Sequence, residues 1–124
     1  MFGFGKKVMG KKKKDIIGLS EIVKIIGNNK SKTIRARIDT GADICSIDAK
    51  LAKQLNLGPV ERVKKIKSAH GIKERPILRA RVQIKKRRFA NVRFSIADRR
   101  HLRYRALIGK NILRNGFLVD PSKR

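Results

Sequence analysis

The stretch IDTGADICSID, residues 38–48, places an acidic residue, Asp39, in a loop made of small side chains. An alternating run typical of a β-strand ends at Ile38, and a second apolar run begins at Ile44. The sequence between them, Asp39-Thr40-Gly41-Ala42, predicts a tight loop that holds a carboxylate at the end of a strand. The tripeptide Asp-Thr-Gly recurs by chance in many proteins. Its meaning therefore depends on the segments on either side.

The segment before this loop predicts a β-hairpin. Apolar runs at residues 22–26 and 33–38 flank the turn sequence Gly27-Asn28-Asn29-Lys30. The second run alternates, because its even positions are apolar whereas Arg35 and Arg37 occupy odd positions. We therefore expect the hairpin to bury one face and to present a basic face to solvent.

The segment after the loop predicts a short helix. Asp48 is a suitable N-cap, and Leu51 and Leu55 follow at helical spacing. We expect the helix to continue through Asn56, because Gly58-Pro59 then ends it.

A second hairpin with a cationic tip is predicted farther along the chain. Residues 78–84 and 92–96 alternate between apolar and polar side chains, and Lys85-Lys86-Arg87-Arg88 lies between them. The remaining predicted elements are an apolar run at 106–109, a helical turn at 110–115 and a strand at 117–119.

These segments predict a mainly β protein with one hydrophobic core. A chain of 124 residues is long enough for one core and too short for two. We assign residues 15–124 to a single domain, a small β-barrel with one or two short helices. Residues 1–14, MFGFGKKVMGKKKK, contain six lysines, three glycines and no acidic residue. They predict a basic RNA-binding arm that is disordered when alone.

The charge of the chain indicates an anionic partner. Lys and Arg number 34 against 9 Asp and Glu, which gives a formal net charge of +25. Each Lys or Arg that neutralises a phosphate releases a counterion, so nucleic acid is the leading candidate. Nothing resembles a helix-turn-helix or a zinc finger. We therefore expect contacts with the backbone and shape of RNA rather than sequence-specific readout of DNA.

Three basic clusters supply the candidate RNA contacts. They lie in the arm, at the tip of the second hairpin, and in residues 98–105, where His101 and Tyr104 interleave with arginines. Phe2 and Phe4 add rings that can stack on unpaired bases. The candidate RNA-binding residues are Lys6, Lys7, Lys11, Lys12, Lys13, Lys14, Lys85, Lys86, Arg87, Arg88, Arg99, Arg100, Arg103 and Arg105.

Three segments together resemble the retropepsin-like aspartic peptidase family. They are IDTGADICSID at 38–48, SAHGIKERP at 68–76, where the family has a flap hairpin, and ALIGKNIL at 106–113. The last of these is similar to the family's apolar-apolar-Gly element, which supports the catalytic loop. The last two, with GFLVDPSK at 116–123, look closest to a small branch that carries the name ATP-dependent zinc protease.

The resemblance covers roughly residues 16–122 and implies a retropepsin-like β-barrel. It implies that Asp39 is the catalytic acid and base, and that Ala69-His70-Gly71 belongs to the flap. Thr40 is then expected to brace the loop by hydrogen bonding, and Gly41 to let two such loops approach closely. Two carboxylates about 3 Å apart share one proton and activate a water molecule. Since the chain has one Asp-Thr-Gly, that pair requires a homodimer.

We expect no metal and no other cofactor. Although the name of the branch contains zinc, Cys45, His70 and His101 occur singly, without ligand spacing. A lone cysteine permits no intramolecular disulfide and favours a reducing, cytoplasmic setting. No apolar run approaches the ~18 residues of a membrane span, and the N-terminal segment lacks the apolar core of a secretory signal.

Two functions fit the sequence. The first is an RNA-binding protein with a retropepsin-like fold, a ribosomal or ribosome-associated component docked on rRNA, with neighbouring ribosomal proteins as possible partners. The alternative is a homodimeric aspartic endopeptidase whose basic surface localises it or attracts acidic substrates. Two copies bring together about +50 of charge, which opposes pairing, although salt screens charges beyond about 8 Å. A second Asp39 within hydrogen-bonding distance of the first distinguishes the two functions.

Overall fold

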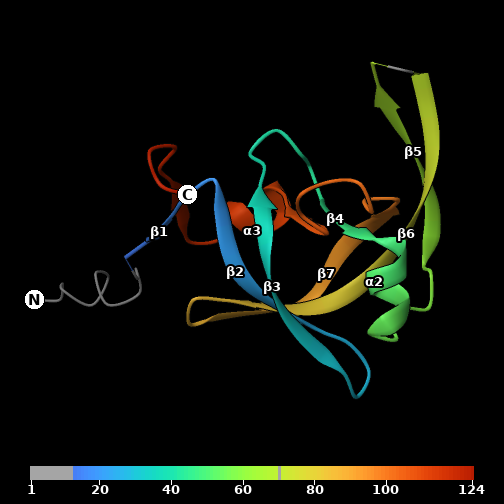
Figure 1. The fold of residues 1–124 in the computed structure, drawn as a ribbon, viewed down its shortest axis with the longest axis horizontal. Coiled ribbons are helices and arrows are strands. Elements are labelled where there is room, and N and C mark those ends of the chain that lie inside the picture. Colours follow the sequence, from blue (N-terminus) through green and yellow to red (C-terminus); the bar gives the residue numbers. More distant parts are fainter. Residues whose placement is uncertain (1–12, 70) are drawn as a thin grey trace, which may run out of the picture.

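The alternating runs of the sequence are β-strands in the computed structural model, which describes residues 13–69 and 71–124 (Figure 1). The strands are β1 (Asp15–Ile17), β2 (Ser20–Ile26), β3 (Ser31–Ile38), β4 (Cys45–Asp48), β5 (Arg62–Ser68), β6 (Gly71–Ile84), β7 (Arg87–Ala97), β8 (Ala106–Ile108) and β9 (Phe117–Val119). The helices are α2 (Ala49–Gln54) and α3 (Lys110–Leu113). Neither helix has the length or apolar character needed to cross a membrane in the described part of the chain.

Six strands close into a barrel. Their order is β2-β3-β8-β4-β7-β6, and β6 pairs again with β2, which completes the ring. Closure leaves these strands without a free sheet edge. The prediction of a small, mainly β barrel with two short helices is therefore confirmed.

The first predicted hairpin is present, and its faces follow the alternation of the sequence. Strands β2 and β3 pair antiparallel from Ser20↔Arg37 to Ile26↔Ser31. Ala36 and Ile38 are buried, whereas Arg35 and Arg37 are exposed. The apolar face joins a core cluster that includes Phe94, Ile47 and Leu78. The hairpin thus brings β3, and the loop that follows it, against the barrel interior.

The helix after the loop begins where the sequence predicts and ends earlier. The Asp48 carboxylate accepts hydrogen bonds from the backbone N–H groups of Lys50 and Leu51, so the predicted N-cap is confirmed. Helix α2 ends at Gln54 rather than at Asn56. Asn56 has a φ of 52°, and this left-handed conformation stops the helix.

The tip of the second hairpin is shorter than predicted. Strand pairing between β6 and β7 reaches Ile84↔Arg87, so the turn contains only Lys85 and Lys86. Arg87 and Arg88, predicted at the tip, therefore belong to β7. A two-residue turn matches the twist of paired strands when its residues adopt positive φ, and Lys85 has a φ of 56°.

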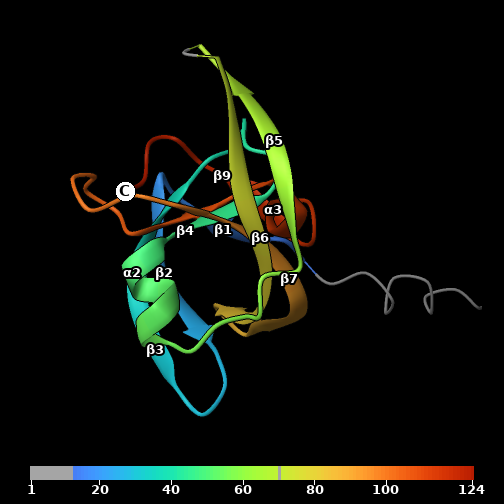
Figure 2. The same cartoon turned by 90° about the vertical axis from the view of Figure 1, so that its right-hand side faces the viewer.

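The longest strand, β6, serves two structures. Its second half pairs with β7 and β2 in the barrel, whereas residues 71–76 pair only with β5. The β5–β6 hairpin therefore projects beyond the barrel (Figures 1 and 2). Most of its described side chains are exposed, so its stability depends mainly on strand hydrogen bonds. Such a ribbon opens at a lower free-energy cost than the core.

The two ends of the described chain form a second, small sheet. Strands β1 and β9 are parallel, with Ile16 opposite Leu118. Ile17 and Phe117 are buried against the barrel. Ile16 and Leu118 have exposed fractions of 50% and 52%, so this sheet has one apolar face that the described residues leave uncovered.

Candidate active site

Asp39 lies in the loop that follows β3, and backbone hydrogen bonds fix its position. Its N–H group donates to the carbonyl oxygen of Ile108 on β8 at 2.9 Å. Its side-chain Oδ1 accepts from the N–H group of Gly41 at 2.9 Å, and the N–H group of Ala42 donates to its carbonyl oxygen at 3.3 Å. The loop therefore holds the carboxylate in one orientation at the end of the strand.

The segment after β8 supports this loop from below. The N–H group of Lys110 donates to the carbonyl oxygen of Ala42 at 2.8 Å, and that of Asn111 donates to the carbonyl oxygen of Asp43 at 3.2 Å. A Cβ on Gly109 would lie 2.7 Å from the carbonyl oxygen of Ile44. Only glycine permits this approach. The structure thus confirms the supporting role that the resemblance assigned to ALIGKNIL.

Thr40 and Gly41 differ in what they contribute to a single chain. Gly41 donates the hydrogen bond that orients Asp39. Thr40 is exposed, and within residues 13–69 and 71–124 no hydrogen bond involves its hydroxyl group. In one chain, the bracing expected from Thr40 comes instead from β8 and the N–H group of Gly41.

The lone cysteine packs under the same loop. The Cys45 thiol donates to Oδ1 of Asn111 at 3.2 Å and accepts from the N–H group of Gly109 at 3.4 Å. Burial raises the pKa of Cys45 to about 12, although both contacts act in the opposite direction. A thiol with this pKa stays protonated near pH 7 and does not act as a nucleophile.

A hollow of about 540 Å³ lies between the Asp39 loop and the projecting hairpin. We call it the flap hollow. It is lined by Gly41, Ala42, Asp43, Ile44, Ser46, Lys64, Lys65, Ile66, Lys67, Arg75, Ser95, Ala97, Asp98, Arg99, Leu102 and Leu107. Its lining combines apolar side chains such as Ile44, Ile66 and Leu107 with charged ones, which suits an extended peptide.

The hairpin that covers the flap hollow corresponds to the flap implied by the resemblance. Ala69 and Gly71 lie at its turn, where Gly71 has a φ of 111° that favours glycine. His70 lies outside the described residues. Lys64 and Arg75 lie directly opposite each other across β5 and β6, and both line the hollow. This pair of like charges makes the inner side of the flap cationic, and the repulsion between them weakens the pairing of the two strands.

Asp48 and Arg105 form an ion pair, with a buried carboxylate, that the sequence does not reveal. Asp48 has an exposed fraction of 1%. Its carboxylate accepts from the Arg105 guanidinium at 3.0 Å and from the backbone N–H group of Arg99 at 2.8 Å. Burial opposes ionisation, but these contacts and the N–H group of Leu51 outweigh it and hold the pKa of Asp48 below its ordinary value.

Several of the arginines predicted to contact RNA bind other groups of the protein instead. Arg99, expected in an exposed loop, is buried with an exposed fraction of 9%. Its Nε donates to the carbonyl oxygen of Tyr104 at 3.0 Å. Arg105 faces Asp48. Arg100 pairs with Asp98 at 2.9 Å. Loop composition indicates charge but not direction, and here two of the four arginines point inward.

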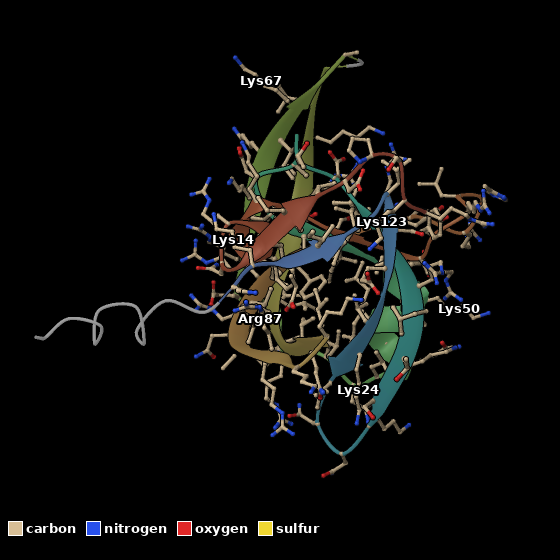
Figure 3. The ribbon with its side chains drawn as sticks, turned by 90° about the vertical axis from the view of Figure 1, so that its left-hand side faces the viewer. Lys14, Lys24, Lys50, Lys67, Arg87 and Lys123 are labelled. Carbon is tan, nitrogen blue, oxygen red and sulfur yellow. The ribbon has the colours of Figure 1, made fainter. Side chains whose placement is uncertain are left out.

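The remaining predicted contacts lie at the surface or outside the described residues. Lys85, Lys86, Arg88 and Arg103 are exposed, as are Lys13 and Lys14. Arg87 is only half-buried, since it pairs with Asp15 at 2.9 Å and lies over the Phe117 ring. Lys6, Lys7, Lys11 and Lys12, together with Phe2 and Phe4, fall outside the described part of the chain. In the view of Figure 3, labelled basic side chains lie at the top (Lys67), the bottom (Lys24), the left (Lys14) and the right (Lys50) rather than in one cluster.

The described residues do not fit a zinc site. Within residues 13–69 and 71–124, no group of three or more His, Cys, Asp or Glu side chains could hold a metal ion. Cys45 is occupied by Asn111 and Gly109. His101 is exposed in the loop before β8. The zinc in the name of the branch therefore has no counterpart among these side chains.

Comparison with known proteins agrees with this geometry. A family model described as gag-polyprotein putative aspartyl protease matches residues 24–115, about three quarters of the chain. No curated protein matches. Among solved structures, the chain is similar to Lpg0085, a protein of unknown function from Legionella pneumophila, with a TM-score of 0.60 and 18% identity over 87% of this chain and 94% of that one.

A second solved structure is a retroviral enzyme. EIAV protease, in complex with the inhibitor HBY-793, has a TM-score of 0.62 and 22% identity over 77% of this chain and 85% of that one. At these identities the likeness to solved structures shows the fold alone. The range that the family model matches includes the Asp39 loop and the segment after β8 that supports it. The chain therefore belongs to the gag-polyprotein aspartyl protease family and has a retropepsin-like fold.

Proposed function

We propose that the protein is a homodimeric aspartic endopeptidase. One observation carries this proposal: Gly41 orients the carboxylate of Asp39, and Gly41 and Ala42 of the same loop line a hollow whose opposite wall is the flap. The chain contains a single Asp-Thr-Gly sequence, so the second carboxylate comes from a second copy. The finer resemblance to the branch named for zinc remains a prediction about ancestry and assigns no step in the reaction.

The proposed reaction is hydrolysis of a peptide bond by a shared pair of Asp39 side chains. The pair holds one proton, because two carboxylates about 3 Å apart do not both ionise readily. The ionised carboxylate takes a proton from water, and the water oxygen attacks the peptide carbonyl carbon while the protonated carboxyl group donates to the carbonyl oxygen. A carboxyl group then protonates the amide nitrogen, and the other carboxylate takes a proton from one hydroxyl group of the intermediate. The C–N bond breaks to give an acid and an amine, and the pair again holds one proton.

The uncovered apolar side chains favour a second copy of this chain as the partner. Ile16 and Leu118 share the exposed face of the β1–β9 sheet. Burying such groups stabilises association by about 25 cal/mol for each Å² removed from water. The net charge of +25 per copy opposes it. Since the Debye length falls from about 10 Å at 0.1 M salt to about 3 Å at 1 M, salt should favour the dimer.

This proposal predicts cleavage that depends on protein concentration and rises with salt. We expect a mixed peptide library to be cleaved at 1 M NaCl by a species of dimeric mass, and the specific activity to fall on dilution. Mass spectrometry of the products and light scattering of the same samples provide the measurement. A monomer at all concentrations and salts, with no products, would contradict the proposal.

We propose RNA binding as a second function, in which the protein is a ribosome-associated component of the cytoplasm. The formal charge of +25 and the exposed turn residues Lys85 and Lys86 favour it. In this function Asp39 serves only to shape its loop.

RNA binding predicts the opposite dependence on salt. The affinity for a structured RNA should fall with salt with a log–log slope of several units. Replacing Lys85, Lys86 and Arg88 with Gln should reduce the slope by about 2, if each contacts one phosphate. Replacing the exposed Lys24, Lys50 and Lys53 provides a control of equal charge. Filter binding at several salt concentrations measures the slope, and a slope near zero contradicts RNA binding.

A further inference from the structure

A second hollow, of about 510 Å³, adjoins the flap hollow and contains no acidic side chain. We call it the arginine hollow. It is lined by Leu19, Arg37, Arg99, Leu102, Arg103, Tyr104 and Leu107. Arg37 lies on β3, two residues before Asp39, and its Cα is paired with Leu107 of β8. The arginine hollow therefore lies beside the candidate catalytic loop.

Arg99 joins the two hollows, because it lines both of them. Arg99 is buried. Among the described residues its guanidinium has no carboxylate within ion-pair distance and donates one hydrogen bond, to the carbonyl oxygen of Tyr104. Burial, then the positive charges of Arg37 and Arg75, lower the pKa of Arg99, while Asp48 and Asp39 act weakly in the opposite direction. A buried cation beside two further cations is costly unless an anion accompanies it.

The carboxylates nearby do not fill this need. Asp43 and Asp98 line the flap hollow, but Asp43 pairs with Lys110 at 3.0 Å and Asp98 with Arg100 at 2.9 Å. Across the flap, Lys64 and Arg75 face each other as like charges. Positive charge around the two hollows therefore exceeds the negative charge available to pair with it, which favours a substrate that carries a negative group.

We propose that the arginine hollow binds an acidic side chain of the peptide substrate, close to the bond that is cleaved; this inference rests on the proposed peptidase function. The apolar side chains of Leu102 and Leu107 suit the methylene groups of Asp or Glu, and Arg37, Arg99 and Arg103 suit the carboxylate. A guanidinium binds a carboxylate through charge-assisted hydrogen bonds. A neutral residue of the same shape leaves these cations without a partner.

Paired peptides that differ only by Glu or Gln at one position test this inference. Starting from a peptide that the enzyme cleaves, each position near the scissile bond carries Glu in one peptide and Gln in its pair. At 0.15 M NaCl we expect kcat/KM to favour Glu by about 10- to 100-fold at one position. The general field of the protein would favour Glu at every position alike, so an effect spread evenly over the peptide overturns the inference.

Two variants of the enzyme locate the effect. In Arg37→Gln the ratio of Glu to Gln cleavage should fall several-fold, whereas in Lys32→Gln it should be unchanged, because Lys32 is exposed on the same strand and lines neither hollow. Both substitutions remove one positive charge. Arg103→Gln provides a second test at the surface of the hollow. A ratio that Lys32→Gln lowers as much as Arg37→Gln does contradicts the assignment.

A binding measurement separates this inference from the peptidase proposal. Fluorescence anisotropy of the Glu and Gln peptides with Asp39→Asn reports binding without cleavage. Preferential binding of Glu that Arg37→Gln abolishes, together with a wild type that cleaves nothing, retains the acidic site and rejects the peptidase. Cleavage with equal ratios retains the peptidase and rejects the site. Displacement of the peptide by a single-stranded oligonucleotide, but not by an acidic peptide, assigns the hollow to phosphate and rejects it as a peptide site.

Discussion

Replacing Asp39 with Asn is expected to lower kcat for peptide cleavage by about 10²–10⁴-fold, because general acid–base catalysis contributes a factor of that size. In a homodimer the single substitution removes both carboxylates of the pair. The amide oxygen of Asn can still accept the hydrogen bond that Gly41 donates to Oδ1 of Asp39. The loop should therefore keep its conformation, and the dimer its mass.

The measurement compares cleavage rates, thermal unfolding and mass for wild type and Asp39→Asn. Asp120→Asn is the matched control, since its carboxylate accepts hydrogen bonds from Ser122 in the turn after β9 and lines neither hollow. We expect Asp120→Asn to cleave as wild type does. Full activity in Asp39→Asn would remove the chemical basis of the proposed function.

Replacing Asp48 with Ala should lower the free energy of unfolding by about 3–5 kcal/mol, because it leaves a partly buried Arg105 without its partner. The loss includes the N-cap of α2, which alone accounts for about 0.5–2 kcal/mol. Domains of this size are stable by about 5–15 kcal/mol, so the variant should unfold at much lower urea concentration. Asp98→Ala is the control, since its ion pair with Arg100 is exposed and contributes little.

The same carboxylate predicts how stability depends on pH. Since folding lowers the pKa of Asp48 below its ordinary value of 3.8, its contribution is present above that pH and is lost as the pH falls through the lowered, folded-state pKa. The wild type should therefore lose stability between pH 5 and pH 2 more steeply than Asp48→Asn, which has no proton to bind. Urea unfolding across this interval measures both slopes, and parallel curves would contradict the assignment.

The sequence predicts those parts of the fold in which local pattern and tertiary packing agree. Asp48 is an N-cap by composition and also by geometry, and the β2–β3 alternation matches burial. The extent of the flap was not predictable, because β5 (RVKKIKS) has no buried face that would impose alternation. Closure of the barrel by β2 and β6 joins residues nearly 60 positions apart, and no local signal marks such pairing.

The candidate site shows the same division. Asp39 and its loop follow from a short motif, whereas the arginine hollow requires the fold to bring Arg37 and Arg99 together. The inward direction of Arg105 depends on Asp48, which lies 57 positions earlier in the chain, whereas the Arg99 side chain is held by the carbonyl oxygen of Tyr104. The pair Arg87–Asp15 spans 72 positions. Charge counts predicted an anionic partner, but only the packing separates structural arginines from available ones.

The closed barrel gives the family a wide tolerance for surface change during evolution. Each barrel strand assigns alternate residues to the core, and the residues between them can vary without disturbing that core, as Arg35 and Arg37 beside Ala36 illustrate. A lineage can thus acquire many lysines and arginines by drift or selection while the Asp39 loop and its Gly109 support stay intact. The position of the Asp39 carboxylate and the charge of the surface are therefore set by different residues, and a substitution can change one without the other.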